Sequence, residues 1–201
     1  MKASPTALVT ANLSFVTVPR REQLLGVAAG LMAERGYHGV SINDLGAAAG
    51  VSGPALYRHF TNKQAVLGAM LVGISQRLLA TGQARVAATG SPEQALVALL
   101  AWHVDFALGE PDLIRVQDRD LASTTPEDRS RVRRLQRAYV ELWVAQLRAV
   151  RPELPEAVAR ARVHAVFGLL NSTPYAGRGL DRDQMARLLQ GLGSAALLAE
   201  A

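Results

Sequence analysis

Capped helix starts recur along the whole chain, and they constrain its fold more than any other feature. Ser91 in "SPEQ" and Thr125 in "TPED" each precede a proline and an acidic residue. This order is typical of a helix start, because the hydroxyl accepts a free backbone N–H and the acid faces the positive end of the helix. Further caps are expected at Ser41, Ser52, Thr61 and Asp181. The chain is therefore divided into a series of α-helices.

Composition agrees with a chain built only from helices. Hydrophobic residues make up 49% of the sequence and aromatic residues only 5%, with Ala and Leu dominating the apolar set. Strong helix formers without long β-branched runs favour an all-α fold, which the caps and the glycine and proline breaks divide into about nine helices.

Positive charge is concentrated near the N-terminus. The formal net charge is +5, and residues 1–68 hold six Lys or Arg against three Asp or Glu. The other 133 residues hold sixteen against fourteen. A basic first third is compatible with binding to nucleic acid, although net charge alone does not establish it.

The sequence gives no support for an enzyme. The absence of cysteine excludes thiol catalysis, disulfides and thiolate metal sites. There is no P-loop, no G-x-S-x-G motif and no His and carboxylate cluster at metal spacing. The segment "GLGSAA" at 191–196 resembles a dinucleotide loop, but it falls inside a predicted helix with no strand before it. We expect no catalytic residue, no metal and no cofactor.

Residues 1–18 are interpreted as a flexible N-terminal arm. Their apolar stretch "ALVTANLSFVTV" is interrupted by polar residues, and no small-residue cleavage site follows it. This pattern favours an arm over a signal peptide. No later segment reaches the roughly 20 uninterrupted apolar residues of a membrane span. A cytoplasmic protein is expected.

Residues 41–60 have the dimensions of a helix-turn-helix, with two short helices joined by "AAGVSG". Gly50 is expected to adopt the left-handed backbone conformation of the turn, and Val51 to pack between the helices. The expected core-facing side chains are Leu45, Leu56 and Phe60. The small residues at the start of "SGPALYRHF" would let backbone N–H groups approach a phosphate.

The segment "GVSINDLGAAAGVSGPALYRHFTNKQAVLGAML" resembles the DNA-binding region of the TetR family of bacterial one-component repressors. The resemblance covers about residues 20–70, and the rest of the chain resembles the family only in the number and length of its helices. It implies an N-terminal three-helix helix-turn-helix domain at 19–68. A C-terminal helical domain for ligand binding and dimerisation would follow at 69–201.

The resemblance also implies roles for individual residues. Tyr57 would contact a phosphate or a thymine methyl group, and His59 and Lys63 would clamp the DNA backbone. Hydroxyls or neighbouring amides would face phosphate at Ser41, Ser52 and Thr61. Bases would be read by Ser52, Gly53, Ala55 and Arg58, with DNA shape carrying part of the specificity. An ordinary solvated helix face is the alternative interpretation of this segment.

The last two helices are expected to form a dimer interface. They carry broad apolar faces with small residues, which allow two helix pairs to cross closely in a four-helix bundle. The predicted interface residues are Val158, Ala161, Ala165, Leu169, Met185, Leu188, Leu189 and Leu192. A purely intramolecular core is the alternative.

Aromatic residues of the middle helices are expected to line a ligand cavity. Several stand one helical turn apart, so they share a face. The predicted set joins five aromatic residues with two polar ones: Trp102, Phe106, Tyr139, Trp143 and Phe167, with Arg115 and Asn171. Asn171 would orient a carbonyl group, and Arg115 would meet an anionic group. Ordinary core packing is the alternative for each aromatic residue, and His103 and His164 are expected to be core histidines.

These expectations describe a ligand-responsive transcriptional repressor. A homodimer would bind an inverted-repeat DNA operator and be released by a small, largely apolar effector, such as an acyl-CoA or a related acid. The C-terminal part loosely resembles the ligand domains of family members that respond to acyl-CoA. The alternative is a helical DNA-binding protein without a small-molecule effector, which acts architecturally or through a protein partner.

Overall fold

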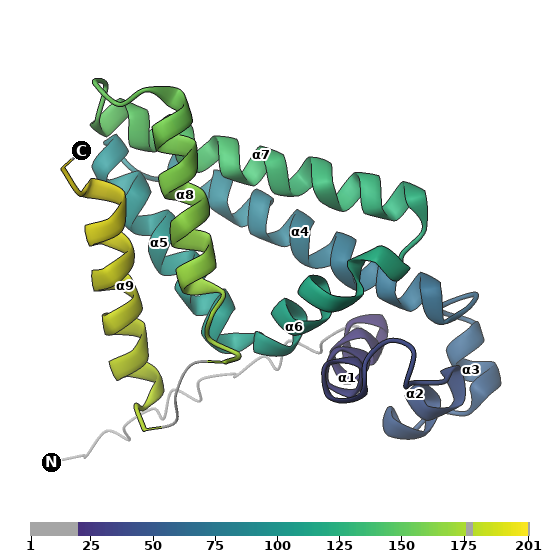
Figure 1. Ribbon diagram of the computed structural model, residues 1–201. Coiled ribbons are helices and arrows are strands. Elements are labelled where there is room, and N and C mark those ends of the chain that lie inside the picture. The colour runs from purple at the N-terminus through teal and green to yellow at the C-terminus, as the bar shows by residue number, and fades with distance from the viewer. Residues whose placement is uncertain (1–19, 176–178, 201) are drawn as a thin grey trace, which may run out of the picture.

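The computed structural model describes residues 20–175 and 179–200, and for Gly53 and Pro54 it describes the backbone alone. Within these ranges the chain forms nine α-helices, one short 3₁₀ helix and no strand (Figure 1). The elements are α1 (Arg20–Arg35), α2 (Ile42–Ala48), α3 (Gly53–Tyr57), α4 (Lys63–Ala87), α5 (Pro92–Gly109), α6 (Pro111–Asp120), η1 (Leu121–Ser123), α7 (Pro126–Val150), α8 (Glu156–Leu170) and α9 (Arg182–Leu198). The predicted all-α fold is confirmed, and the predicted arm at 1–18 lies outside the described residues.

Helices α1, α2 and α3 pack with the first half of α4 around one core, to which α6 and α7 add Val116 and Val132. Gly36 ends α1 with a φ of 79°, and Gly50 has a φ of 65° in the turn between α2 and α3. Both values lie in the left-handed region that glycine adopts without steric cost. The predicted core-facing residues are buried: Leu45, Leu56 and Phe60. The helix-turn-helix packing expected from the sequence is therefore observed.

Most predicted helix caps are present. The side chains of Ser91 and Thr125 each accept a backbone N–H from the first turn of their helix. Ser41 and Asp181 form capping boxes, in which the cap and the third helical residue each bind the backbone of the other. These contacts satisfy N–H groups that a helix start otherwise leaves without partners.

Two caps differ from the prediction. The prediction that Thr61 caps α4 is wrong, because Asn62 holds that position and its side chain accepts the N–H of Ala65 at 2.8 Å. Ser52 stands at the N-cap of α3, but its side chain makes no capping hydrogen bond. One amide that it could bind does not exist, because Pro54 has no N–H.

Helix α3 is shorter than the sequence predicts. It ends at Tyr57 instead of Phe60, and the next two residues form a turn. The N–H groups of His59 and Phe60 both donate to the carbonyl of Leu56, at 2.9 and 3.0 Å. The bond from His59 is a tighter, 3₁₀-type contact, which brings Phe60 into the core.

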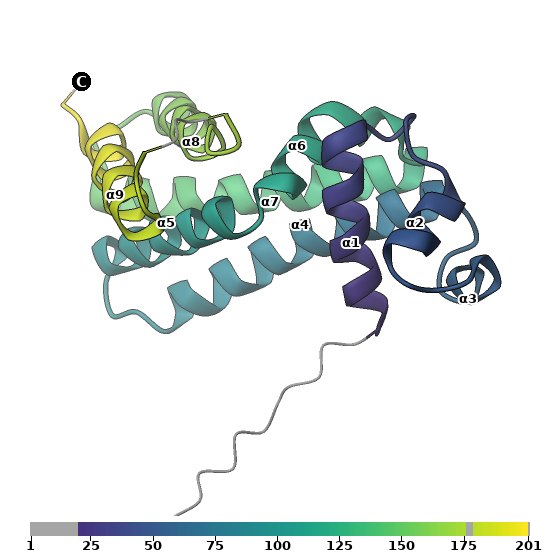
Figure 2. The same ribbon diagram turned by 90° about the horizontal axis from the view of Figure 1, so that it is seen from below.

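The rest of the chain is built on two long helices, α4 and α7, which run side by side (Figures 1 and 2). Their close approach requires a glycine, since a Cβ at the buried Gly82 would lie 2.8 Å from Cε2 of Tyr139. Helices α5, α8 and α9 gather at the end of this pair that is remote from α1–α3 (Figure 1). They enclose a second core, which includes Trp143 and Leu147.

Among the described helices, α4 is long and apolar enough to cross a membrane by length and composition. Its position explains this apolar character, because it packs against α1, α5, α6 and α7. Just over half of its most apolar stretch is buried inside the fold. Central helices of globular proteins commonly have such a composition.

Candidate DNA-binding surface and ligand cavity

The end of α3 presents a group of exposed polar side chains. Tyr57 is 52% exposed although the preceding Leu56 is buried, and Arg58 and His59 are exposed in the turn that follows. Ser41, Ser52 and Thr61 are also exposed, whereas Ala55 is only partly exposed. The exposure of Gly53 is not described. Hydroxyl, guanidinium and imidazole groups in this arrangement can bind phosphates and base edges.

Lys63 lies beside this surface, but its ammonium group also has partners within the chain. Its Nζ donates to the carbonyls of Tyr37 at 2.7 Å and Val40 at 2.5 Å, and it lies 4.2 Å from the centre of the Tyr37 ring. An ammonium group has three protons, so two bonds within the chain leave one donor. Lys63 thus fastens the turn between α1 and α2, and its predicted phosphate contact stays a prediction.

Two arginines at the start of α1 border the same surface, although the sequence analysis did not single them out. Arg20 donates to the carbonyl of Ala49 at the end of α2, at 2.9 Å. The guanidinium of Arg21 lies 4.9 Å from the centre of the Phe60 ring. Both residues are exposed. The basic "RRE" at a helix start in the positively charged first third was the signal that could have identified them.

A cavity of about 190 Å³ lies between α4, α5, α6, α7 and α8. Three nearly parallel rings form part of its wall: His103 lies 4.7 Å from Phe167, and Tyr139 lies 5.6 Å from Phe167, between ring centres. The polar residues of the lining are Ser75, His103, Gln117, Gln136, Tyr139, His164 and Asn171. None of the described residues that line it is Lys, Arg, Asp or Glu.

The sequence identified part of this lining. The predicted ligand residues that line the cavity are Phe106, Tyr139, Phe167 and Asn171. Trp143 does not line it, because it is fully buried and packs edge-on against Phe167 with ring centres 5.1 Å apart. Trp102 is directed elsewhere, since its Nε1 donates to the carbonyl of Leu78 and Arg85 covers its ring. Both tryptophans are therefore packing residues in this structure.

Arg115 does not line the cavity either, so the predicted contact with an anionic ligand group is not supported there. Its guanidinium donates to Asp112 at 3.3 Å and to the carbonyl of Pro174 at 2.7 Å. Thr173 donates to the carbonyl of Ala107 at 2.9 Å. Arg115 and Thr173 thus tie the segment that follows α8 to α6 and α5.

The two histidines of this region differ. His103 is buried as predicted, and its Nε2 lies 3.0 Å from Oδ1 of Asn171, but its Nδ1 has no described partner within the chain. Burial lowers the pKa of His103 to about 4, so the ring is neutral at pH 7. The prediction that His164 is a core residue is wrong, because its side chain is exposed at the cavity that it helps to line.

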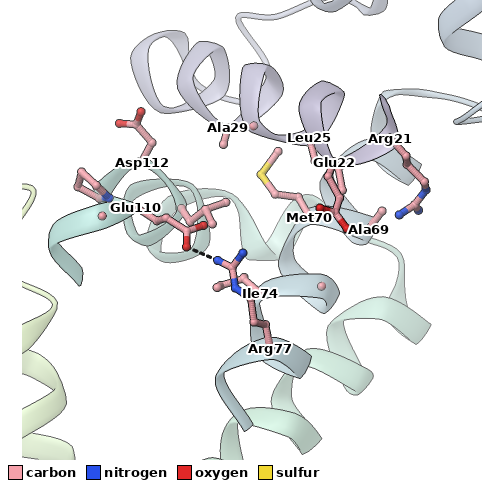
Figure 3. Close-up of a pocket in the computed structure, with 15 residues that line it drawn as sticks. Arg21, Glu22, Leu25, Ala29, Ala69, Met70, Ile74, Arg77, Glu110 and Asp112 are labelled. Carbon is pink, nitrogen blue, oxygen red and sulfur yellow. Dashed lines mark hydrogen bonds and ion pairs between the residues drawn. The ribbon is translucent and has the colours of Figure 1, made fainter. Parts of the chain in front are cut away.

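A larger hollow of about 450 Å³ is a cleft between α1, α4 and α6 (Figure 3). Leu25 of α1 faces Met70 of α4 across it, and Arg77 forms an ion pair with Glu110 at one side. The charged groups of the cleft lie at its partly exposed edge, where they reach water or each other. The aromatic cavity, whose described lining carries no Lys, Arg, Asp or Glu, is therefore the better candidate for an apolar ligand, and the cleft marks the joint of α1 with α4 and α6.

Helix α6 connects the cavity with the N-terminal helices. Ile114 and Gln117 of this helix line the cavity. Two residues after Gln117, the guanidinium of Arg119 donates to the carbonyls of Met32 and Ala33 in the last turn of α1. A cation at this position satisfies free carbonyls and faces the negative end of the helix.

The next residue extends the same contact. The buried carboxylate of Asp120 pairs with Arg119 and accepts the backbone N–H of Tyr37, just after α1, at 3.2 Å. Gln64 of α4 donates to the carbonyl of Ser123 in η1 at 3.0 Å. A displacement of α6 would therefore act directly on the end of α1.

Helices α8 and α9 leave an apolar face exposed at the far end of the molecule. The exposed large apolar residues there are Val158, Leu188, Leu192 and Leu198, between 38% and 48% exposed. Ala161 and Ala165 are exposed too, and Leu169 and Met185 are partly buried against their own core. Leu189 does not belong to this face, since only 5% of it is exposed. Its place in the predicted interface is corrected accordingly.

Two family profiles match this chain. The one described as "Bacterial regulatory proteins, tetR family" matches residues 24–70, and the one described as "Tetracyclin repressor-like, C-terminal domain" matches residues 89–187. The transcriptional repressor KstR2 of Rhodococcus jostii is 27% identical over 131 residues, which is 65% of this chain and 64% of that protein. The nucleoid occlusion factor SlmA of Haemophilus ducreyi is 34% identical over 98 residues, 48% of each chain. The matched region thus spans less than two thirds of either relative.

Solved structures agree on the fold. The TetR-family regulator PfmR of Thermus thermophilus superposes with a TM-score of 0.77 at 24% identity, over 92% of this chain and 99% of that one. The structure of AibR in complex with isovaleryl coenzyme A and operator DNA superposes with a TM-score of 0.71 at 21% identity, over 87% and 97%. Because the two profiles together match most of its length, the chain belongs to the TetR family of bacterial regulatory proteins, whose members are regulators and not enzymes.

Proposed function

We propose that this protein is a ligand-responsive transcriptional repressor. A homodimer would bind an inverted-repeat operator in the bacterial cytoplasm and leave it when a small, largely apolar effector binds. Residues 19–68 would bind DNA and residues 69–201 would bind ligand and form the dimer. The observation that carries the proposal is the position of α6, which lines the cavity with Ile114 and Gln117 and holds the end of α1 with Arg119.

The exposed group at the end of α3 supports the DNA-binding part of the proposal. Tyr57 and His59 would contact the phosphate backbone, and Arg58 is the longest side chain available to read a base edge. A single helix this short contacts too few base pairs for useful specificity. Two copies related by a two-fold axis would place their α3 helices in successive major grooves, about 34–36 Å apart.

The apolar face of α8 and α9 supports the dimer. Leu188 and Leu192 lie one helical turn apart on α9 and are nearly half exposed, and Val158 of α8 adds to the same face. Pairing two such faces would remove these side chains from water, which is the main driving force for association.

The effector is the least direct part of the proposal. The aromatic and aliphatic cavity suits an apolar group. The solved relative AibR contains isovaleryl coenzyme A, which supports a short acyl thioester as one effector class. Because no charged residue is among the described residues that line the cavity, only the acyl end would enter it, and the coenzyme would remain outside.

Signalling would follow from a preference of the ligand for one position of α6. A ligand shifts a conformational equilibrium only by its difference in affinity for the two states, commonly 1–3 kcal/mol. Filling the cavity would displace Ile114 and Gln117, and Arg119 would carry that displacement to the carbonyls of Met32 and Ala33. The two α3 helices would then lose their spacing on DNA.

The test combines DNA selection with effector release. Binding to random double-stranded DNA, followed by footprinting, should yield an inverted repeat with the spacing given above. Isovaleryl-CoA and butyryl-CoA should then be titrated against the complex. The Arg119→Ala variant should still bind effector but release DNA less readily, whereas a control at the exposed Arg133 of α7 should behave as wild type. Failure to enrich any DNA sequence would contradict the proposal.

The match to a nucleoid occlusion factor favours one second candidate, a DNA-binding protein that acts without a small-molecule effector. It shares the predicted DNA surface and dimer but requires no communication from the cavity. Sequence-specific DNA binding that no compound relieves, together with an Arg119→Ala variant that is indistinguishable from wild type, would support this candidate.

A further inference from the structure

Two buried polar atoms at the cavity have no hydrogen-bond partner among the described residues: Nδ1 of His103 and the hydroxyl of Tyr139. Both side chains line the cavity and are only 3% and 4% exposed. Buried polar groups in folded proteins are nearly always paired, because an unpaired one destabilises the fold. Two unpaired groups on residues that line one cavity therefore suit a ligand that would reach and pair them.

His103 lines the cavity and carries one ring nitrogen without a described partner. Its Nε2 faces Oδ1 of Asn171 at 3.0 Å, and this bond places the single ring proton on Nε2. The ring stays neutral because burial lowers its pKa to about 4. Nδ1 then carries a lone pair, which accepts a hydrogen bond and therefore requires a donor. If the Asn171 amide were turned over, Nδ1 would carry the proton and require an acceptor, and a hydroxyl group satisfies both cases.

Tyr139 offers a hydrogen-bond donor on a neighbouring ring. Its ring centre lies 5.9 Å from that of His103, with the planes 17° apart. Burial raises the pKa of the Tyr139 phenol, and the nearby indole of Trp143 lowers it by less, so the hydroxyl keeps its proton. The unpaired indole N–H of Trp143 can only donate, so it leaves the phenol proton available to a ligand. The donor of Tyr139 and the acceptor of His103 thus stand on adjacent parallel rings, and one hydroxyl group of a ligand can accept from the first and donate to the second.

The charge of the lining excludes an ionised ligand group from the interior. No described residue of the lining is Lys, Arg, Asp or Glu, and Ser75 already donates its hydroxyl to the carbonyl of Leu71 at 2.8 Å. A carboxylate or ammonium group buried here would lose its hydration without gaining an opposite charge. The buried part of the ligand is therefore neutral.

The volume of the cavity limits the size of that part. At about 190 Å³ it is somewhat larger than a cavity of roughly 150 Å³ that accommodates one benzene molecule. It therefore holds a single six-membered ring with one or two substituents, or an acyl chain of comparable size. A fused four-ring skeleton or a long fatty chain exceeds this volume.

We infer that the cavity binds a small neutral apolar group that carries one hydroxyl, and that this hydroxyl bridges Tyr139 and His103. The inference rests on the proposed function, since it names the chemistry of the same effector site. Two sources supply such a group: a free phenol or alcohol, and a short hydroxyacyl thioester whose coenzyme stays outside.

Matched ligands test the role of the hydroxyl. The pair 4-ethylphenol and ethylbenzene differs only by that group, and so does the pair 3-hydroxybutyryl-CoA and butyryl-CoA. Calorimetry and tryptophan fluorescence on the full chain should show at least about tenfold tighter binding of the hydroxylated member in at least one pair. The pair that discriminates identifies the source of the hydroxyl.

Tyr139→Phe removes the bridging hydroxyl alone and leaves the ring in place. Because it also removes an unpaired buried atom, the free variant should melt no lower than wild type. Discrimination within the matched pair should fall to about threefold or less. The control Tyr175→Phe changes a tyrosine that is 69% exposed, and it should keep full discrimination. His103→Leu should abolish the same discrimination from the acceptor side.

The outcomes separate this inference from the proposed function. Equal binding of both members in both pairs would overturn the inference, as would a discrimination that survives Tyr139→Phe. Release of operator DNA by butyryl-CoA without any preference for hydroxylated ligands would leave the proposed function standing and this inference wrong. Hydroxyl-dependent binding by a protein that selects no DNA sequence would uphold the inference and overturn the proposed function.

Discussion

The two functional ends of this molecule are built in opposite ways. At the DNA end, the end of α3 presents exposed side chains such as Tyr57 and Arg58, and the five-residue helix has no side-chain cap. At the cavity end, the functional groups are buried, and two of them lack hydrogen-bond partners among the described residues. Under the proposed function, recognition of DNA would depend on what the surface presents, and recognition of ligand on what the core leaves unpaired. Substitutions at the two ends should therefore fail differently.

The largest expected effect links the two ends, because a change on the dimer face should weaken DNA binding at the opposite end of the molecule. Replacing both Leu188 and Leu192 by Glu places charges on the predicted subunit contact, and the dimer should dissociate to monomers. Operator affinity should fall at least 100-fold, because a single half-site retains only part of the contacts. Sedimentation and DNA-binding titrations measure both effects. A variant that sediments as a dimer would place the interface elsewhere.

Acid should destabilise the cavity end through His103. Its pKa is about 4 in the folded chain against 6.5 for an ordinary histidine, so the unfolded state binds more protons between these values. The free energy of unfolding should therefore decrease as the pH falls from about 6.5 to about 4, by up to about 3 kcal/mol. Urea unfolding of wild type and His103→Leu across this pH range isolates the contribution of His103 to the pH dependence, since only the wild type has this histidine. His164→Gln, at an exposed histidine, is the control and should follow wild type.

Truncating the most exposed aromatic side chain of the DNA end should affect function without affecting stability. Tyr57→Ala should weaken operator binding by about 2 kcal/mol, roughly 30-fold, as a lost phosphate or methyl contact would. The free energy of unfolding should change by less than about 0.5 kcal/mol, because Tyr57 is half exposed. Circular dichroism and thermal melts check the second point. A variant that loses its cooperative transition would show that Tyr57 is a packing residue.

Two glycines of α4 provide a matched pair along one helix. Gly82→Ala places a Cβ 2.8 Å from Cε2 of Tyr139 beside the cavity, and it should destabilise the fold by about 1–3 kcal/mol. At Gly73, in the cleft of Figure 3, a Cβ meets nothing within 4 Å, so Gly73→Ala should stabilise the fold by about 0.5–1 kcal/mol. Denaturant unfolding should give opposite signs. Equal effects would mean that the close packing of α4 on α7 is absent in solution.

The smallest effect is expected at Lys63. Lys63→Ala should weaken binding to all DNA sequences alike and lower the salt dependence of binding by about one unit of slope. The bonds from Nζ to Tyr37 and Val40 would be lost as well, so the free energy of unfolding should fall by about 1 kcal/mol. Salt titrations separate the two roles. An unchanged slope with lower stability would leave Lys63 only its structural role.

Much of the fold follows from local sequence. Helix starts at Ser41, Ser91, Thr125 and Asp181 were predictable because a cap and its amide are at most three residues apart. The left-handed turn at Gly50 and the exposure of Tyr57 followed from the helix-turn-helix pattern in the same way. The cap of α4 was one local error, because Thr61 and Asn62 are adjacent candidates and only the helix register decides between them.

The cavity could be predicted only in part. Aromatic spacing along single helices identified Phe106, Tyr139 and Phe167, but the same spacing also selected Trp102 and Trp143, which pack away from the cavity. Spacing shows which residues share a face of one helix, and it does not show what that face meets. Position in three dimensions decides whether an aromatic ring lines a cavity or fills a core.

By itself, the sequence determined the all-helical fold, the helix-turn-helix and the exposed group at the end of α3, because short-range capping, turn and periodicity rules govern all of these. Only the tertiary structure decided that Arg119 holds the end of α1, that Lys63 binds two carbonyls and that His103 and Tyr139 meet at one cavity with unpaired atoms. Each of these joins groups from segments that are distant in the sequence. The physical reason is that burial and hydrogen bonding depend on which distant segments come together, and no local pattern records that arrangement.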